Sequence, residues 1–421
     1  MAAKLIKKPV TGMKDILPRE MEIRDYLIAL IKKTYKGFGY TPIETPCVEN
    51  IENLCSKNGG ENEKLIFKIL KRGAKLDLDS ASSEQDLVDS GLRYDLTVPL
   101  VRYYSNNAQD LPSPFKALQI GSVWRADRPQ KGRFRQFVQC DIDVLGDPTN
   151  LAEIELILAT TTLLGKIGFS GFVVHINDRR ILKAMAAYSG FAPETYDQVF
   201  ITLDKMDKIG LDGVSAELLE QGFDKEAVER YTSLFTAMEG TADPLAALAQ
   251  KLGDALPAEV YDGLSQIMTG AKNVSGADYI LKFDPTLVRG MSYYTGTIFE
   301  ITMEGFPFSV AGGGRYDEMV GKFTGTPTCA CGFSIGFERI VTILLDQGYT
   351  VETEEKKAYL VEKTMPMDRL AEIISRAQEE RKQGRAVLVS YMNKNRKFQK
   401  EQLTNEGYTE IVDFYTEELK K

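Results

Sequence analysis

The residues best suited to chemistry lie in one stretch, Phe115 to Gly146. Gln139, Asp141 and Asp143 alternate along its second half, so on a strand all three side chains would project from the same face. Because buried carboxylates need partners, such a face is a poor core surface and a good site for a cationic ligand. Arg125 ends the first half, where a fixed arginine can bind a phosphate group.

A polar, basic segment connects the two halves of this stretch. Alternating residues on either side predict two strands, and the Pro and Gly between them predict a long loop. The loop could contact a polyanion, or the whole stretch could be a salt-bridged surface hairpin, and these residues alone do not decide between the two. The segment reads Asp127, Arg128, Pro129, Gln130, Lys131, Gly132, Arg133.

The same stretch resembles motif 2 of the class II aminoacyl-tRNA synthetases. The resemblance rests on Arg125-Ala126-Asp127, on the loop Arg128 to Arg133 and on the return strand Phe134 to Gly146. The basic loop followed by an aromatic residue and Arg-Gln-Phe is similar to the histidyl-tRNA synthetase subgroup in particular. The segment Gly12 to Pro18 also resembles the opening of that subgroup.

A second segment, Leu92 to Arg102, places Asp95 and Thr97 just before a helix that begins near Pro99. A carboxylate and a hydroxyl in front of a helix are usually caps, and in isolation that interpretation is favoured. In the resembled family this position holds the α-ammonium group of the amino acid. The resemblance therefore adds Asp95, Leu96 and Thr97 to the expected histidine site.

A third segment runs from Leu287 to Gly296 and contains Arg289, Tyr293 and Tyr294. It could be a bulged strand. It also resembles a histidine-specific signature, in which an arginine reaches the α-phosphate and tyrosines line the imidazole pocket. Ser292 departs from the pattern, which usually has Asp there, and this leaves the local charge open.

Two glycine-rich segments follow. Ala311 to Asp317 resembles the second histidine-specific signature, and its glycines would let a ligand approach the backbone closely. Gly332 to Ile340 resembles motif 3, whose arginine, here Arg339, binds ATP. An arginine in a first helical turn is disfavoured by the helix dipole, so Arg339 is expected to face an anion.

Several elements must position these residues. A helix is predicted over Arg19 to Lys36 and a strand over Tyr40 to Pro46, which together resemble motif 1, the dimer interface of class II enzymes. The predicted fold is mixed α/β (α+β), with an antiparallel-sheet catalytic domain at 1–345 and a helical insertion at about 181–275. A linker at 346–357 and a short anticodon-binding-like α/β domain at 358–421 complete it.

Composition narrows the function classes. A chain of 421 residues can hold two or three domains, and its net charge of −8 argues against general adhesion to nucleic acid. The only histidine, His175, has apolar sequence neighbours and is predicted to be a packed core residue, so no metal site is expected. Five scattered cysteines, no membrane-length apolar run and no signal-peptide core predict a cytoplasmic protein.

The resemblance implies a homodimeric enzyme that takes histidine, ATP and tRNA(His), with Mg²⁺ carried on ATP. It assigns the α-phosphate to Arg125 and Arg289, which are the expected catalytic residues. The expected histidine site comprises Asp95, Leu96, Thr97, Arg125, Gln139, Asp143, Arg289, Tyr293 and Tyr294. The expected ATP site comprises Arg125, Asp127, Arg133, Phe137 and Arg339, and the expected tRNA contacts are Arg128, Gln130 and Lys131.

Two alternatives stay open. The regulatory subunit of ATP phosphoribosyltransferase shares the catalytic-domain fold, but it typically lacks a C-terminal domain and has lost ATP-binding arginines. Here Arg125, Arg133, Arg289 and Arg339 are all present, which favours the enzyme. A tRNA-binding paralogue without chemistry would rest on Ser292 and the short C-terminal domain.

Overall fold

The structure, a computed structural model, describes residues 5–55, 61–130, 132–272, 274, 276–288, 294–351 and 355–417. The chain forms two compact units, one of Met1–Asp15 with Leu27–Leu344 and one of Ile16–Tyr26 with Leu345–Lys421. Within the described ranges, no helix is long and apolar enough to cross a membrane. The predicted domain boundaries at 345 and 358 stay a prediction.

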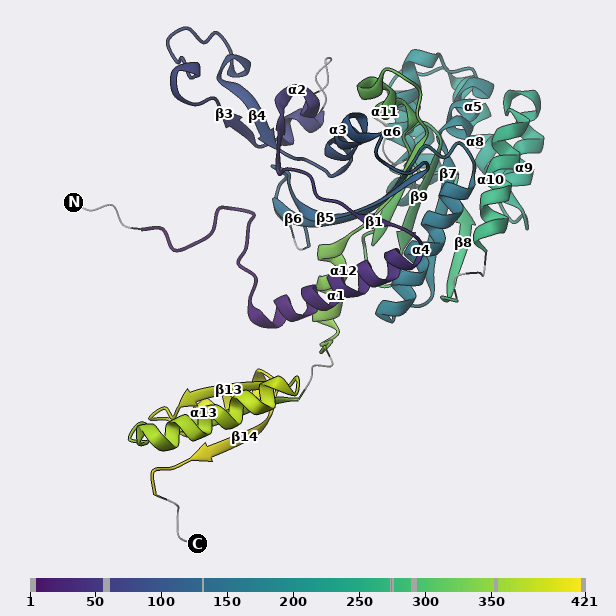
Figure 1. Cartoon of the computed structure of the whole chain (residues 1–421). Helices are drawn as coiled ribbons and strands as arrows, with labels where there is room; N and C mark the ends of the chain where they lie inside the picture. Colours follow the sequence, from purple (N-terminus) through teal and green to yellow (C-terminus); the bar gives the residue numbers. More distant parts are fainter. Residues whose placement is uncertain are drawn as a thin grey trace. The chain divides into compact units, whose positions relative to one another are not determined.

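An eight-stranded, mostly antiparallel sheet forms the centre of the first unit (Figure 1). Only its two edge pairs, β1 with β5 and β7 with β8, are parallel. The predicted α/β class with an antiparallel catalytic sheet is therefore confirmed. In spatial order the strands are β1 (Thr41–Pro42), β5 (Phe115–Trp124), β6 (Gln136–Leu145), β11 (Ala330–Ile335), β10 (Ala311–Arg315), β9 (Thr297–Thr302), β7 (Phe172–Asp178) and β8 (Tyr279–Phe283).

Strands β5 and β6 form the predicted hairpin, and they pair without interruption from Phe115 with Leu145 to Trp124 with Gln136. The two faces of β6 differ as the alternation predicts. Cys140, Ile142 and Val144 are buried apolar residues, and α4 (Leu151–Ile167) contacts β6 and the adjoining β11. The opposite face of β6 carries the polar side chains of the candidate site.

The other elements before β12 are a small sheet and a series of helices, of which α1 and α12 each span both units. The chain between β1 and β5 forms a small antiparallel sheet, with its strands in the order β2-β4-β3 (Figure 1). The predicted helical insertion is a run of helices between β7 and β8, and its status as a separate domain stays a prediction. The small sheet consists of β2 (Val48–Asn50), β4 (Val88–Leu92) and β3 (Lys68–Leu70), and the helices, apart from α4, are α1 (Pro18–Gly37), α2 (Ile51–Leu54), α3 (Thr97–Asn107), α5 (Arg179–Ser189), α6 (Tyr196–Leu203), α7 (Met206–Glu220), α8 (Lys225–Met238), α9 (Pro244–Leu252), α10 (Ala258–Ala271), α11 (Asp317–Thr324) and α12 (Phe337–Asp346).

The second unit contains a three-stranded parallel sheet with one helix on each face. Its strands lie in the order β13 (Ala386–Tyr391), β12 (Lys356–Val361), β14 (Tyr408–Phe414). Apolar residues of α13 (Met367–Lys382) pack on one face, and those of α14 (Arg396–Asn405) pack on the other. β12 begins at Lys356, two residues before the predicted start of this domain.

The prediction that His175 is packed among apolar neighbours is wrong. Its Nδ1 lies 2.8 Å from Asp284 Oδ2, and its Nε2 lies 2.9 Å from Thr302 Oγ1. Asp284 follows β8, and Thr302 ends β9, so both partners come from neighbouring strands. The residues next to His175 in the sequence could not reveal Asp284 and Thr302, because these two partners lie on or just after the strands that flank β7 in the sheet.

A buried ion pair joins α4 to the glycine-rich strand β10. Arg315 Nε lies 2.6 Å from Glu153 Oε1, and Arg315 Nη2 lies 2.7 Å from Glu153 Oε2. Their side chains are only 11% and 1% exposed. Such a two-pronged pair fixes the two elements at a defined distance, and neither charge can be removed without leaving the other buried.

We expect Glu153→Gln to lower the free energy of unfolding by about 3–5 kcal/mol, because it leaves the Arg315 charge buried and unneutralised. Urea denaturation would measure this loss. The matched control is Glu155→Gln on the same helix, whose ion pair with Lys116 is more exposed, at 27% and 24%. That change should cost about 1 kcal/mol or less. Equal losses for the two variants would contradict a special role for the buried pair.

Candidate active site

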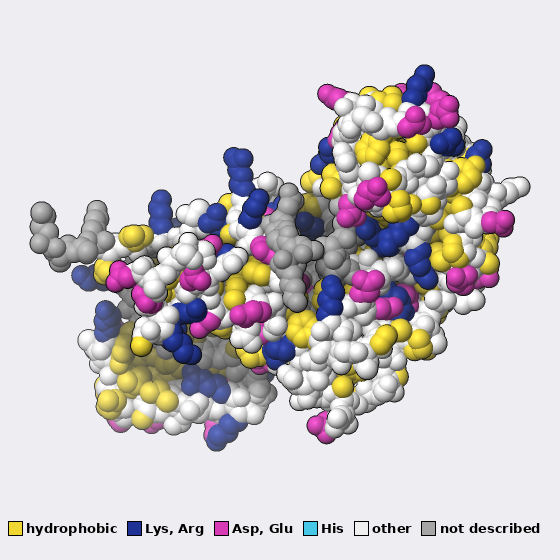
Figure 2. All heavy atoms as spheres, turned by 90° about the horizontal axis from the view of Figure 1, so that it is seen from above, with side chains coloured by type: hydrophobic (Ala, Val, Ile, Leu, Met, Phe, Trp, Pro, Cys, Tyr) yellow, Lys and Arg dark blue, Asp and Glu magenta, His cyan; other side chains and the backbone are white. Residues whose placement is uncertain are grey.

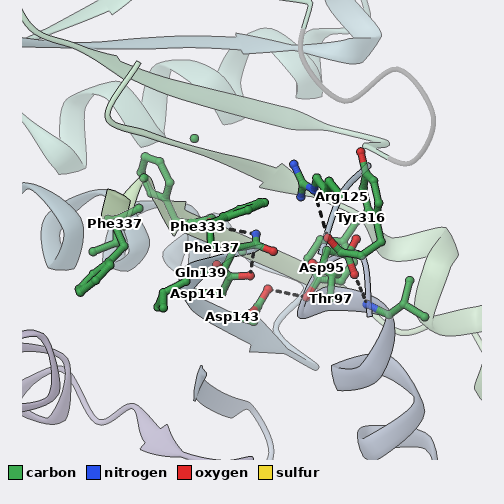
Figure 3. Close-up of a pocket in the computed structure, with 18 of the residues that line it drawn as sticks. Asp95, Thr97, Arg125, Phe137, Gln139, Asp141, Asp143, Tyr316, Phe333 and Phe337 are labelled. Carbon is green, nitrogen blue, oxygen red and sulfur yellow. Dashed lines mark hydrogen bonds between the residues drawn. The ribbon is translucent and has the colours of Figure 1, made fainter. Parts of the chain in front are cut away.

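A cavity of about 1360 Å³ opens over the polar face of β6. Strands β6, β10 and β11 form its floor, and the start of α12, the segment before α3 and the loop after β5 form its walls. Gln139, Asp141 and Asp143 lie side by side along the floor (Figure 3). The predicted grouping of these three side chains on one face is thus confirmed.

Glycine on the neighbouring strand creates the room for Asp143. Gly332 of β11 pairs directly with Asp143. A Cβ atom at Gly332 would lie 1.9 Å from Asp143 Oδ1, far inside van der Waals contact. Side chains directly opposite one another on a sheet share a face, so only glycine lets the carboxyl group lie flat over β11.

The acceptor atoms of the floor are only partly used. Tyr316 Oη donates to Asp143 Oδ1 at 2.7 Å, and Gln139 Nε2 points to Asp141 Oδ2 at 3.5 Å and to Ser334 Oγ at 3.4 Å. Three buried acceptors have no hydrogen-bond partner among the described residues, namely Gln139 Oε1, Asp141 Oδ1 and Asp143 Oδ2. Buried polar atoms are normally satisfied, so this trio fits a ligand that carries several hydrogen-bond donors.

Burial dominates the titration of the cavity carboxyl groups. It raises the pKa of Asp141 to about 7, with a hydrogen bond from Ser334 opposing the rise, Asp95 adding to it and Arg125 opposing it less strongly. It raises the pKa of Asp143 well above the usual value, and the Asp141 charge adds to that rise. Burial also raises the pKa of Asp95. A cation bound among these three carboxyl groups would reverse the rise and would itself be held strongly.

Arg125 is held in place between two aromatic rings. Its Nε donates to the carbonyl oxygen of Tyr94 at 3.1 Å. Its Cζ atom lies 4.3 Å from the centre of the Tyr94 ring and 5.2 Å from that of Phe137. Contacts with ring faces and a backbone acceptor restrict the guanidinium group, so it is oriented before any anion arrives.

Asp95 combines the two interpretations offered by the sequence. Its Oδ1 accepts a hydrogen bond from the backbone N–H of Val98 at 3.1 Å, as a helix cap does, and the residue also lines the cavity. Thr97 begins α3 and lines the cavity too. The side chain of Leu96 is buried in the core instead, and its carbonyl oxygen accepts from Gln119 Nε2.

The residues of the expected ATP site lie on another wall of the same cavity. Asp127 and Arg133 form an ion pair of 3.2 Å. Arg339 Nη1 donates to the Ser309 carbonyl oxygen at 2.5 Å, and its Cζ lies 5.2 Å from the centre of the Phe308 ring. Asp127, Arg133, Phe137 and Arg339 all line the cavity together with Arg125.

The family model described as histidyl-tRNA synthetase matches residues 12–340 of this sequence, more than three quarters of its 421 residues. The chain belongs to the histidyl-tRNA synthetase family. The matched range contains every segment that forms the cavity. It ends within α12, before the second unit's sheet begins at Lys356.

Similar proteins carry the same family name. A histidine–tRNA ligase of Leifsonia xyli is 45% identical over 348 residues, which cover 80% of each chain. One of Christiangramia forsetii is 38% identical, over 80% of this chain and 76% of that protein. The crystal structure of histidyl-tRNA synthetase from Nostoc has a TM-score of 0.79 at 26% identity, covering 96% of this chain and 90% of that one.

A further structure shows the fold alone. It comes from Bacillus halodurans and is described as an ATP phosphoribosyltransferase regulatory subunit/histidyl-tRNA synthetase. Its TM-score is also 0.79, over 99% of this chain and 100% of that chain, but its sequence identity is 22%. The same fold therefore occurs in a protein whose description names both a regulatory subunit and a synthetase. The fold cannot separate these two functions, so the residues of the site must do so.

Some expected residues of this histidyl-tRNA synthetase-family chain are not in the cavity wall. Arg128 and Gln130 are exposed on the loop, where Gln130 and Arg133 exchange two backbone hydrogen bonds of 3.1 and 3.0 Å. Tyr294 does line the cavity. The predictions for Lys131, Arg289 and Tyr293 fall outside the described residues.

Among the cavity residues that were missing from the expected site, Asp141 and Tyr316 matter most for its floor. Asp141 shares the alternation of Gln139 and Asp143, so its sequence position was a sufficient signal. Tyr316 follows the glycines of the second histidine-specific segment, but nothing in the sequence shows that its hydroxyl reaches Asp143. That contact depends on the pairing of β11 with both β6 and β10.

The raised pKa of Asp141 predicts how stability varies with pH. In the native state this carboxyl group takes up a proton near pH 7, whereas in the unfolded chain it does so near its ordinary value, about 4. Its contribution therefore stabilises the ligand-free fold as pH falls from about 7 towards 4, and it is lost as pH rises through 7.

We expect Asp141→Asn to remove this contribution. The increase in unfolding free energy between pH 7.5 and 5.5 should be smaller in the variant, by roughly 1–3 kcal/mol, than in the wild type. Urea denaturation at several pH values would measure it. An unchanged pH profile would show that Asp141 is already ionised in the free cavity.

Proposed function

We propose that the chain is a histidine–tRNA ligase, which activates histidine with ATP and transfers it to tRNA(His), releasing AMP and pyrophosphate. The observation that carries this proposal is that one cavity has both a surface of hydrogen-bond acceptors and a surface of arginines. Three acceptor oxygens on its floor have no hydrogen-bond partner in the part of the chain that the structure describes, and Arg125, Arg133 and Arg339 line the same space. An amino acid with a cationic end and a polyanionic nucleotide could bind side by side there.

The acceptor side suits histidine. We assign the α-ammonium group to Asp95, Thr97 and Gln139, and the imidazole to Asp143 with Tyr294. An imidazole N–H can donate to the open Oδ2 of Asp143, whose other oxygen is held by Tyr316. A cavity built to receive hydrogen bonds discriminates against side chains that cannot supply them, because its buried acceptors would stay unpaired.

The cationic side suits ATP. We assign the α-phosphate to Arg125, with Arg289 as its second ligand on the strength of the sequence signature. Phe137 is assigned to the adenine ring, and Asp127, Arg133 and Arg339 to the rest of the nucleotide. Magnesium is expected to arrive on the ATP phosphates, since it keeps several waters and favours phosphate oxygens over protein cages.

The first step needs no nucleophile from the protein. An oxygen of the substrate carboxylate attacks the α-phosphorus, the bond from that phosphorus to the bridging oxygen breaks, and pyrophosphate leaves with the bonding electrons. Arg125 then stabilises the charge that builds on the α-phosphate oxygens. In the second step a terminal ribose hydroxyl of the tRNA attacks the activated carbonyl carbon, and AMP leaves. Alignment and charge stabilisation are thus the tasks of the chain.

The tRNA is expected to meet local cations. Arg128, Gln130 and Lys131 of the loop are assigned to its acceptor end. Figure 2 shows Lys and Arg side chains intermixed with Asp and Glu side chains over the described part of one face, which suits local phosphate contacts. A homodimeric assembly and a cytoplasmic location stay predictions.

Histidine-dependent exchange between ATP and pyrophosphate, measured without tRNA, tests the first step. We expect activity in the wild type and a loss of about 100–1000-fold in Arg125→Ala, because removal of one positioned donor typically costs that much. Arg376→Ala, an exposed arginine of α13, should leave exchange unchanged. Histidine binding without any wild-type exchange would favour the regulatory-subunit alternative.

The loop gives a second test, which separates the two steps. We expect Lys131→Ala to leave pyrophosphate exchange nearly intact but to lower aminoacylation and make it more sensitive to salt at low tRNA concentration. Phosphate contacts supply sequence-independent, salt-dependent attraction, so their loss should act on the tRNA step alone. An equal fall in both steps would assign Lys131 to the nucleotide instead.

A further inference from the structure

Asp141 is the floor residue to which the proposed function gives no task. It lies on β6 between Gln139 and Asp143, its side chain is buried, and it lines the cavity (Figure 3). Its Oδ1 has no hydrogen-bond partner among the described residues. A buried carboxylate oxygen left open at the floor of a cavity is costly to the free protein, which points to a ligand that pairs with it.

The other oxygen of Asp141 determines which end of the Gln139 amide faces the cavity. Gln139 Nε2 points to Asp141 Oδ2 and Ser334 Oγ, which leaves Gln139 Oε1 as the open end of the amide. When a bound cation keeps Asp141 ionised, its carboxylate can only accept hydrogen bonds, so it favours the NH₂ end of a neighbouring amide over the carbonyl end. Asp141 therefore orients Gln139 as an acceptor towards the cavity.

The spacing of the strand places Asp141 beneath the centre of the proposed ligand. Alternate residues on one face of a strand are about 6.7 Å apart. A histidine whose ammonium group contacts Gln139 and whose imidazole contacts Asp143 must therefore cross over Asp141. The charged groups that influence the pKa of Asp141 are Asp95 and Arg125 of the cavity lining, Arg93, and Asp143 on the same strand.

We propose that Asp141 is a further specificity-determining residue, which accepts a hydrogen bond from the ligand's α-ammonium group and positions Gln139 to accept another. This inference rests on the proposed function, because it takes histidine as the ligand. It adds Asp141 to the residues already assigned to the ammonium group, which are Asp95, Thr97 and Gln139. The imidazole is left to Asp143.

Asp141→Asn tests the proposal, because it removes the charge and lets the amide of Gln139 turn its NH₂ end towards the ligand. Three probes would be titrated by calorimetry: L-histidine, L-histidinol and 3-(imidazol-4-yl)propionate. The first two carry the ammonium group and the third lacks it. We expect the variant to bind histidine and histidinol about 10–100-fold more weakly, and the third probe within about threefold of the wild type.

Glu300→Gln is the matched control. Glu300 lies on the same face of the same sheet, through the pairs Asp141–Ser334, Ser334–Gly312 and Gly312–Glu300, but it does not line the cavity. The same change of charge there should leave all three affinities unchanged. A similar loss in this control would attribute the effect to the general field of the sheet and overturn the proposal.

The remaining outcomes are also decisive. If Asp141→Asn weakens all three probes equally, Asp141 acts on the imidazole or on the shape of the cavity, and the proposal is wrong. Wild-type affinity for histidine in the variant would likewise overturn it. Failure of the wild type to bind histidine at all would overturn the proposed function instead, so the two failures are distinguishable.

Discussion

The cost of burying carboxyl groups without counter-ions governs the design of this fold. Asp95, Asp141 and Asp143 crowd one cavity, and burial raises the pKa of each. Such a group is held in place only when its surroundings are rigid, because otherwise the side chains would swing into water and the chain would relax around them. The antiparallel sheet supplies that rigidity for Asp141 and Asp143, which stand on β6 between β5 and β11, and the hydrogen bond from the Val98 N–H holds Asp95 in front of α3.

A second layer of fixed charges supports the first. Arg93 is buried with its guanidinium group over Gly121 of β5, and it donates to the carbonyl oxygens of Ser122 and Thr45 at 2.8 and 2.7 Å. The Arg315–Glu153 pair ties the glycine-rich strand β10 to α4. Both arginines are satisfied within the protein, whereas the cavity acceptors are not. The chain thus separates the charges that maintain the fold from those that are kept for a ligand.

Local patterns predicted the parts of this molecule that depend on neighbours in sequence. Alternation along Phe115–Gly146 gave the β5–β6 hairpin and the shared face of Gln139, Asp141 and Asp143, because strand geometry has a fixed period of two. It could not give the partners of His175 or the contact of Tyr316 with Asp143, because both depend on which strands become neighbours. Strand order is a property of the whole chain, and no short pattern encodes it. The family resemblance contributed what periodicity could not, namely the order of the motifs.

The absence of a side chain at Gly332 has an evolutionary consequence. With the Asp143 side chain in its present position, a Cβ atom at position 332 would collide with its carboxyl group, so a substitution of Gly332 requires that this side chain shift or be replaced. Either response moves or removes the acceptor on the cavity floor. Replacement of Asp143 by a smaller residue meets no such obstacle, because the residue opposite it is glycine. The two positions are therefore coupled in one direction, and we expect a change of amino-acid preference in this cavity to begin on β6 rather than on β11.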